Sequence, residues 1–352
     1  MDSITQAVLG ATIQGAMLGR AQGRRALVYG AILGTLPDLD VLISYPDPVS
    51  SMTFHRGFSH SLIVLSGFSI LLAWLVSKIR PSPHYSPARL LLAIWLVLTT
   101  HTLLDAFTSY GTQLLWPFMP TPAAWSTIFI VDPAYTVPMA LVTLTGLLFG
   151  VGRAMQRWLR GALALSTAYL AFTVGGKLVI EQRAREALAQ HDVEVSAVFS
   201  GTAPLNSLLW RVIAKDNAGD YHEGFIGLLD QGEPSFVRLP LNGELAANLR
   251  ASTEHARLKW FTGDWLRYDV IGDRLVVTDL RMGMTGHHFF RFVMAHREAG
   301  QWQAIVPYDW HGPWMDRQLG LLWSRVWDES VQLPLARWDE RMTAPAPAAA
   351  QE

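Results

Sequence analysis

The sequence predicts an α-helical integral membrane domain of about six spans, followed by a soluble domain that is mainly β or α+β. Hydrophobic residues make up 50% of the 352-residue chain and charged residues only 16%. This composition is too apolar for an ordinary soluble enzyme and is typical of a membrane protein. The apolar segments are concentrated in the first half, since charged residues become frequent only after about residue 185.

Charge and cysteine content exclude several classes of function. A net charge of −1 argues against a nucleic-acid partner, which needs a broad basic surface. The chain has no cysteine, so disulfides, thiolate zinc sites and a cysteine nucleophile are excluded. It also has no GxSxG elbow, P-loop or GxGxxG motif, which argues against serine hydrolysis and nucleotide binding.

The first two apolar segments, 4–19 and 26–43, are short for the roughly 20 residues that a membrane span needs. Both contain glycines four residues apart, a spacing that lets membrane helices approach closely. We therefore predict a tightly packed helical hairpin whose second helix ends at an acidic pair; two interfacial helices are the alternative. The glycines concerned are Gly15 and Gly19, and Gly30 and Gly34.

Four further segments have nearly the expected length of a span and carry few charges. They are residues 61–79, 90–107, 134–152 and 161–180. Together with the hairpin they give six predicted crossings.

The distribution of basic residues predicts the orientation in the membrane. The loops 20–25, 78–89 and 153–160 hold nine Lys or Arg residues, whereas the alternate loops 37–60 and 108–133 hold one. By the positive-inside rule the basic loops are cytoplasmic. The alternate loops are therefore predicted to face the extracytoplasmic side, as is the domain that follows an even number of spans.

The second half of the chain reads as a separate domain. After a transmembrane region at 1–185, stretches such as WLRYDVI and RLVVTDL alternate apolar and polar residues between Gly, Asp and Asn turns. We expect a soluble extracytoplasmic domain over 186–340 and a disordered tail at 341–352.

Candidate metal ligands come from four separate segments that are predicted to meet at the extracytoplasmic face. His101 and Asp105 are spaced i, i+4 on one helix and therefore share a face, while the others lie in or beside the outer loops. Carboxylates and imidazoles are ligands that divalent metals take from proteins. The seven candidates are Asp38, Asp40, His55, His60, His101, Asp105 and Asp132.

These residues have other interpretations when taken singly. A lone His in an apolar helix is more often packed and hydrogen-bonded than a ligand, and Asp38 and Asp40 suit the end of a helix beside Pro37. Their convergence favours a metal site of one or two divalent ions, with zinc favoured and manganese or magnesium as alternatives.

Three segments, PDLD, HRGFSHS and HTLLDAFTSYGTQLLWPF, occur in this order within residues 1–150. They resemble the membrane-bound metal-dependent hydrolases, a group of bacterial inner-membrane proteins. The resemblance implies a hydrolase of the bacterial inner membrane, and it does not extend to the C-terminal domain. Many of those proteins have a His where this chain has Gln6. The motif positions are occupied here by Asp38, Asp40, His55, His60, His101 and Asp105.

The resulting hypothesis is a membrane hydrolase that cleaves an ester or phosphoester of a lipid or lipid-linked substrate at the extracytoplasmic face. Asp132 is expected to be a ligand or general base. Arg56, the one basic residue in the outer loops, is assigned to the substrate phosphate or to developing negative charge. The alternatives are a divalent-cation transporter or sensor, and a structural membrane protein in which the metal holds helices together.

Overall fold

The computed structural model describes residues 1–310 and 318–344 of the chain. Two compact units can be distinguished, and neither is a single stretch of sequence. The first unit comprises Met1–Ile43, His55–Val174 and Pro204–Asn206. The second comprises Ser44–Phe54, Gly175–Ala203 and the chain from Ser207 onward.

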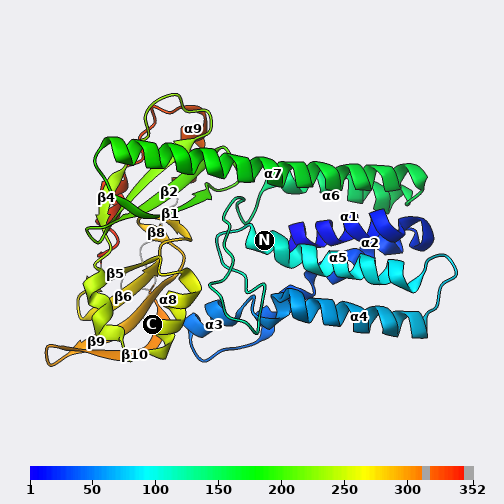
Figure 1. Ribbon diagram of the computed structural model, residues 1–352, viewed down its shortest axis with the longest axis horizontal. Helices are drawn as coiled ribbons and strands as arrows, with labels where there is room; N and C mark the ends of the chain where they lie inside the picture. The colour runs from blue at the N-terminus through cyan, green and yellow to red at the C-terminus, as the bar shows by residue number, and fades with distance from the viewer. Residues whose placement is uncertain (311–317, 345–352) are drawn as a thin grey trace. The chain divides into compact units, whose positions relative to one another are not determined.

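The first unit is helical, and its long helices run side by side (Figure 1). Helix α1 packs most extensively on α2 and also contacts α5 and α6, while α4 packs on α5. The helical elements are α1 (Ser3–Gln22), α2 (Arg25–Thr35), η1 (Pro37–Leu42), η2 (Phe58–His60), α4 (Leu62–Ile79), α5 (Pro87–Ala106), α6 (Pro133–Phe149) and the first part of α7 (Arg153–Gln190).

The prediction of six membrane spans is not supported. In the described part of the chain, three helices are long and apolar enough to cross a membrane, namely α4, α5 and α7, and α6 is a shorter apolar helix of 17 residues. Helix α2 ends at Thr35, after 11 residues: Leu36 keeps helical backbone, with φ −64° and ψ −40°, but Pro37 has no N–H to continue the helical hydrogen bonds. The chain continues instead as the short 3₁₀ helix η1.

Helix α7 also differs from the expected span at 161–180. It has 38 residues, about 57 Å at 1.5 Å per residue. The basic residues of 153–160, expected to form a loop, occupy its first two turns. Long basic side chains are good helix formers and reach toward water from a helix end, which explains the extension.

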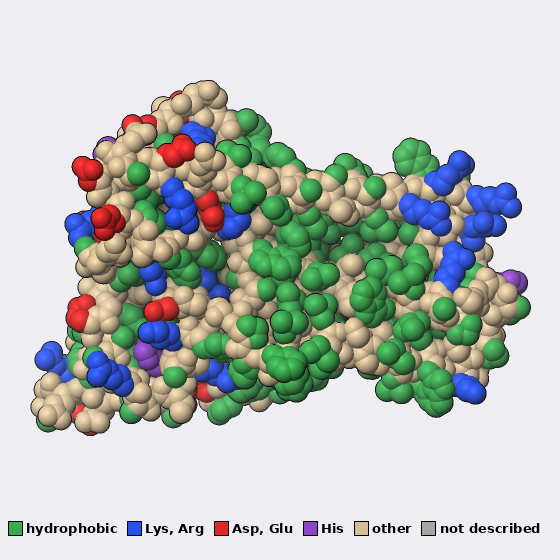
Figure 2. Space-filling model, in the orientation of Figure 1, with side chains coloured by type: hydrophobic (Ala, Val, Ile, Leu, Met, Phe, Trp, Pro, Cys, Tyr) green, Lys and Arg blue, Asp and Glu red, His purple; other side chains and the backbone are tan. Residues whose placement is uncertain are grey.

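The surface of the helical region is largely apolar. On the face seen in Figure 2, hydrophobic side chains cover much of this region and basic side chains gather at one end. Ile70, Leu71 and Trp74 on α4 are each more than half exposed. A contiguous apolar surface of this kind is typical of helices in contact with lipid.

The contact between α1 and α2 depends on glycine. A Cβ added to Gly10 would lie 2.2 Å from the carbonyl oxygen of Gly30, and one added to Gly34 would lie 2.5 Å from the carbonyl oxygen of Gln6. The predicted close packing is therefore present. Its centre differs from the prediction, because Gly15 instead faces Leu27 and Leu159.

The second unit is rich in β-sheet, as the alternating segments predict. It contains an antiparallel sheet of order β1-β2-β3-β4, another of order β10-β9-β6-β5, and the small pair β7-β8. The strands are β1 (Val195–Thr202), β2 (Leu209–Asp216), β3 (Asp220–Gly227), β4 (Val237–Pro240), β5 (Leu266–Ile271), β6 (Arg274–Asp279), β7 (Gly283–Met284), β8 (His287–His288), β9 (Arg291–Glu298) and β10 (Gln301–Asp309).

Short helices complete the second unit: α3 (Pro48–Phe54), η3 (Gly243–Leu249), α8 (Thr253–Thr262), α9 (Gln318–Trp327) and α10 (Leu335–Asp339). Residues 341–344 of the expected tail are described, and the side chain of Met342 is fully buried. Residues 345–352 lie outside the described part of the chain.

The sheets enclose paired charges. The Arg211 guanidinium forms two hydrogen bonds of 2.9 Å with the Glu223 carboxylate, which also accepts from Thr285. Burial by itself would raise the pKa of Glu223, but these donors hold it below its ordinary value. Removing either partner of such a pair strongly destabilises the folded state, because the other charge is left buried and unpaired.

Candidate metal centre

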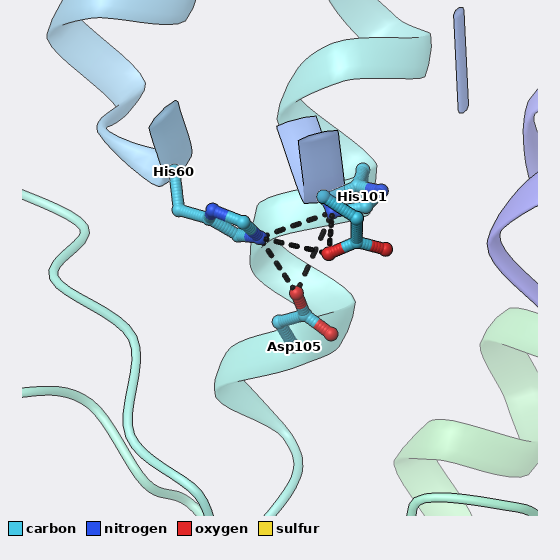
Figure 3. A group of neighbouring side chains, drawn as sticks. His60, His101 and Asp105 are labelled. Atoms are coloured by element: carbon cyan, nitrogen blue, oxygen red, sulfur yellow. Dashed lines mark hydrogen bonds and ion pairs between the residues drawn. The ribbon is translucent and has the colours of Figure 1, made fainter. Parts of the chain in front are cut away.

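Four side chains from three elements of the first unit converge on one point (Figure 3). Asp38 comes from η1, His60 from η2, and His101 and Asp105 from successive turns of α5. One ligand atom of each lies within 4.8 Å of the other three, and within residues 1–310 and 318–344 this is the one group of His and acidic residues with that property. The structure thus brings together four of the seven predicted candidates.

Five of the six separations between these atoms are 3.1–3.5 Å, close enough for ligands of one cation, and the sixth, between Asp38 and Asp105, is within 4.8 Å. His60 Nε2 lies 3.1 Å from Asp105 Oδ2, 3.3 Å from Asp38 Oδ1 and 3.2 Å from His101 Nε2. His101 Nε2 lies 3.4 Å from Asp38 Oδ1 and 3.5 Å from Asp105 Oδ2. Ligands of a tetrahedral zinc ion at 2.0–2.2 Å are separated by about 3.3–3.6 Å. Octahedral magnesium, at 2.0–2.1 Å, would need about 2.9 Å between neighbouring ligands.

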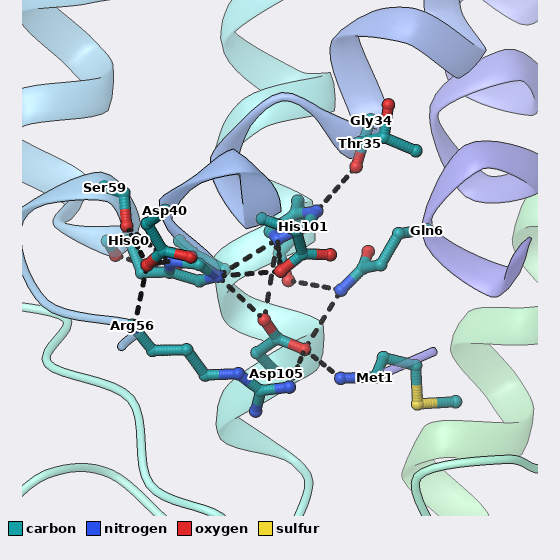
Figure 4. Close-up of polar contacts among 12 residues, drawn as sticks. Met1, Gln6, Gly34, Thr35, Asp40, Arg56, Ser59, His60, His101 and Asp105 are labelled. Carbon is teal, nitrogen blue, oxygen red and sulfur yellow. Dashed lines mark hydrogen bonds and ion pairs between the residues drawn. The ribbon is translucent and has the colours of Figure 1, made fainter. Parts of the chain in front are cut away.

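The hydrogen bond of His101 directs a lone pair into the cluster. Its Nδ1 lies 2.6 Å from the carbonyl oxygen of Gly34. Because a carbonyl can only accept, Nδ1 carries the proton, and Nε2 of the neutral ring presents its lone pair to the other ligands. Figure 4 shows this contact at the end of α2. Metal-binding histidines are commonly oriented in this way.

His60 is oriented by a chain of two hydrogen bonds. The Ser59 hydroxyl lies 2.6 Å from Asp40 Oδ2 and donates to it, since a carboxylate oxygen can only accept. The same hydroxyl oxygen lies 2.9 Å from His60 Nδ1 and accepts from it. In the neutral form of its ring, His60 Nε2 therefore also faces the cluster with a lone pair. The Nε2 atoms of the two histidines lie 3.2 Å apart, and either a shared proton or a metal cation can offset the repulsion between their lone pairs.

The two oxygens of Asp105 have different surroundings. Oδ1 accepts from Gln6 Nε2 at 3.1 Å, pairs with Arg56 Nη2 at 3.2 Å, and contacts the amino nitrogen of Met1. Oδ2 is buried, and among the described residues the nitrogens that lie near it are His60 Nε2, at 3.1 Å, and His101 Nε2, at 3.5 Å. A buried carboxylate oxygen is costly unless a donor or a cation compensates it, and this one faces the two imidazole nitrogens. The donor set and its geometry fit a divalent cation.

The centre is exposed on one side only. The side chains of His60, His101 and Asp105 are 0–1% exposed, whereas that of Asp38 is 18% exposed. The neighbours of Asp38 on η1 point outward and are strongly exposed apolar residues: Leu39 (56%), Val41 (71%) and Leu42 (77%).

Asp40 and His55, both predicted as ligands, lie outside the group of four. Asp40 accepts from the Arg56 backbone at 3.0 Å and from Ser59, and it holds His55 Nδ1 at 2.8 Å. The element that carries Asp38 and Asp40 explains their separation. In a 3₁₀ helix, with about three residues per turn, residues i and i+2 point in different directions. Asp40 thus orders the loop that holds His60.

The remaining predicted residues also have defined contacts. The Arg56 guanidinium is buried and pairs with Asp105, with a further hydrogen bond to Thr108 and a stacking contact with Tyr110. Asp132 caps α6 through Tyr135 N and accepts from the Tyr169 hydroxyl at 2.8 Å. Asp132 is thus not brought to the four ligands.

Sequence reasoning missed two groups that act on the centre. Ser59 lies between two candidate ligands in the HRGFSHS segment, and its position beside His60 could have indicated a hydrogen bond to that histidine. The carbonyl oxygen of Gly34 could not have been found from the sequence, because every residue has a backbone acceptor and the residue type does not show which one is used.

Comparisons with known proteins place the chain among inner-membrane proteins. The uncharacterized protein YfhP of Bacillus subtilis (strain 168) is 25% identical over 256 residues, which cover 68% of this chain and 73% of that protein. No solved structure matches the chain. The family model described as YdjM inner membrane protein matches residues 1–179, about half of the chain and the part that carries all four ligands. The chain therefore belongs to the YdjM inner membrane protein family.

Proposed function

We propose that this protein is a membrane-embedded, metal-dependent hydrolase that cleaves an ester or phosphoester of a lipid or lipid-linked substrate at the extracytoplasmic face. One observation carries the proposal: the ligand atoms of the buried His60, His101 and Asp105 converge with that of Asp38, all within 4.8 Å of one another. Zinc is the ion that this arrangement fits best. A bound divalent ion would supply Lewis acidity and a water nucleophile of lowered pKa.

The four residues would have different roles in the metal centre. His60, His101 and Asp105 are buried and held by fixed partners, so they form the rigid part of the centre. Asp38 is partly exposed and lies on a short 3₁₀ helix, which makes it the ligand that can yield a position to water or substrate. Arg56 compensates the charge of Asp105, so we assign it to that carboxylate rather than to substrate. Asp132 receives no catalytic role.

The surroundings of Asp38 support a lipid substrate. A molecule that reaches the centre from this side passes the exposed side chains of Leu39, Val41 and Leu42. An amphiphile would contact these apolar side chains while its polar linkage lies at Asp38. A fully water-soluble ester would gain nothing from them.

The proposed orientation rests on charge. The basic residues of the α1–α2 turn, the α4–α5 loop and the start of α7 gather at one end of the helices (Figure 2). The four ligands lie at the other end. By the positive-inside rule the ligand end faces the extracytoplasmic side.

A second function is favoured by the ligand count. Four protein ligands fill a tetrahedral shell, which is the pattern of structural zinc sites. A metal that only holds η1, η2 and α5 together is therefore the competing proposal.

The test begins with metal content, measured by elemental analysis of the detergent-purified protein. We expect about one ion per chain in the wild type, as four ligands predict, and its loss in His60→Ala and Asp105→Asn. Asp132→Asn is the matched control, because it changes a buried carboxylate outside the group. Absence of metal from the folded, metal-replete wild type would refute the proposal.

Activity then separates the two functions. The metal-loaded protein is incubated with phospholipids in mixed micelles and, separately, with a soluble phosphate monoester. Metal-dependent cleavage of the lipid would support the hydrolase. Full metal occupancy without cleavage of any ester would favour the structural role.

A further inference from the structure

The loop that carries the candidate metal centre is interrupted by a segment of the other unit. Asp38 and Asp40 precede Ser44–Phe54, and His55, Ser59 and His60 follow it directly. Ser44–Phe54 itself belongs to the second unit, where α3 contacts α8 and β10. The chain thus leaves the first unit and returns to it between two parts of one site.

Arg257, on α8, holds the end of this segment. Its guanidinium carbon lies 3.5 Å from the centroid of the Phe54 ring, within the range of a close cation–π contact. Its Nε donates to Thr53 Oγ1 at 2.8 Å, and Thr53 is fully buried. The Phe54 ring also stacks on Tyr45, with 5.1 Å between ring centroids. All of these contacts lie within the second unit.

The residues that follow Phe54 have little freedom to absorb a displacement. Neighbouring Cα atoms are 3.8 Å apart, so Phe54 and His55 move together. His55 is bound to Asp40. Arg56 has a φ of +58°, in the left-handed region that a residue with a side chain rarely adopts. It binds Asp40 through its backbone N–H and Asp105 through its guanidinium.

We propose that Arg257 is a positioning residue: by holding Thr53 and Phe54 it fixes His55 and Arg56, and through them the loop that presents His60 to the candidate metal centre. The C-terminal domain thereby controls the order of a site to which it contributes no ligand. The proposal rests on the metal centre of the proposed function for its affinity readout, but not for its structural one.

The structural readout is hydrogen exchange of the full-length protein, followed by mass spectrometry on peptides that cover residues 55–61. The amides of Arg56, His60 and Ser61 are hydrogen-bonded and report directly on this loop. In Arg257→Ala we expect their exchange to rise roughly three- to thirtyfold, as expected for the loss of one close cation–π contact. Arg297→Ala is the matched control, since Arg297 lies 5.7 Å above the Trp302 ring.

Two further variants guard against a general effect on folding. Thr53→Val leaves Arg257 in place but removes its hydrogen bond to Thr53, together with the bond from the Thr53 hydroxyl to the Val49 carbonyl, and should raise exchange at residues 55–61. Arg257→Lys retains the charge but loses the planar guanidinium, and should fall between wild type and Arg257→Ala.

The affinity readout is zinc binding in competition with a chromogenic chelator. Weaker binding in Arg257→Ala but not in Arg297→Ala would support the proposal. Faster exchange at residues 44–54 with unchanged exchange at 55–61 would overturn it, because α3 would then be held without any effect on the loop. If the wild type binds no zinc while the exchange pattern is as expected, the positioning role stands and the proposed function fails.

Discussion

The orientation of His60 by Ser59 gives the sharpest prediction. Replacing Ser59 with Ala removes the acceptor of the His60 Nδ1 proton and a donor to Asp40. The ring then gains access to its other tautomer, in which Nε2 carries the proton and cannot bind a cation. Metal affinity should fall, although none of the four ligands is changed.

The magnitude follows from the distances. Loss of a partner that orients a metal ligand typically costs about 10- to 100-fold in affinity, or about 1.4–2.7 kcal/mol. Here Asp40 Oδ2 lies 3.7 Å from His60 Nδ1, too far for a hydrogen bond but close enough to become the acceptor after a small rotation. We therefore expect Ser59→Ala to lie near the lower end, at about 10- to 30-fold.

The assay is a zinc competition titration with a chromogenic chelator, performed on the purified wild type and three variants. Ser59→Thr retains the hydroxyl and should bind as the wild type does. Ser109→Ala removes a comparable serine hydrogen bond, 2.6 Å from Ser126, and is the control for loss of any such bond. A change of less than about twofold in Ser59→Ala would refute the assigned role of the hydroxyl.

Three further predictions concern packing, metal removal and pH. Gly10→Ala should destabilise the protein by about 1–3 kcal/mol in thermal unfolding in detergent, because the new methyl group meets the backbone of α2. Gly67→Ala, whose new methyl group would meet nothing within 4 Å apart from its chain neighbours and the nearby backbone of its own helix, should be neutral or stabilising by up to about 1 kcal/mol. Removing metal with a chelator should lower the melting temperature of the wild type but leave that of His101→Ala unchanged. In the second unit, the lowered pKa of Glu223 contributes stability that is complete above its ordinary value of 4.5 and is lost as the pH falls toward the folded value. Near-UV circular dichroism during acid titration should show this loss, and Glu223→Gln should reduce the dependence on pH.

Much of the architecture could be predicted from apolar segments. The predicted segments 61–79, 90–107 and 134–152 correspond closely to α4, α5 and α6, because long apolar runs bounded by loops leave little choice of structure. The count of six spans was not supported, and two helices differ from the prediction. Pro37 ended α2 early, while α7 continued through charged residues that the hydropathy of a span would exclude.

The candidate metal centre could also be predicted only in part. His101 and Asp105 could be paired from helical spacing alone. Asp38 and Asp40 could not be separated, since the difference depends on a 3₁₀ turn that hydropathy does not reveal. Arg56 was expected to face substrate because it is the one basic residue of its loops, but the fold buries its guanidinium against Asp105.

Gly34 shows why this centre would be difficult to transfer to another protein. The absence of its side chain allows α2 to approach α1, and its carbonyl oxygen holds the His101 proton on Nδ1. A design that grafted the four ligands onto a helical scaffold with larger residues would separate those helices and lose that acceptor. Its histidines would be present, but each could adopt the tautomer in which the nitrogen facing the metal carries the proton. The minimal transferable unit is therefore the glycine-packed helix pair together with η1, η2 and α5.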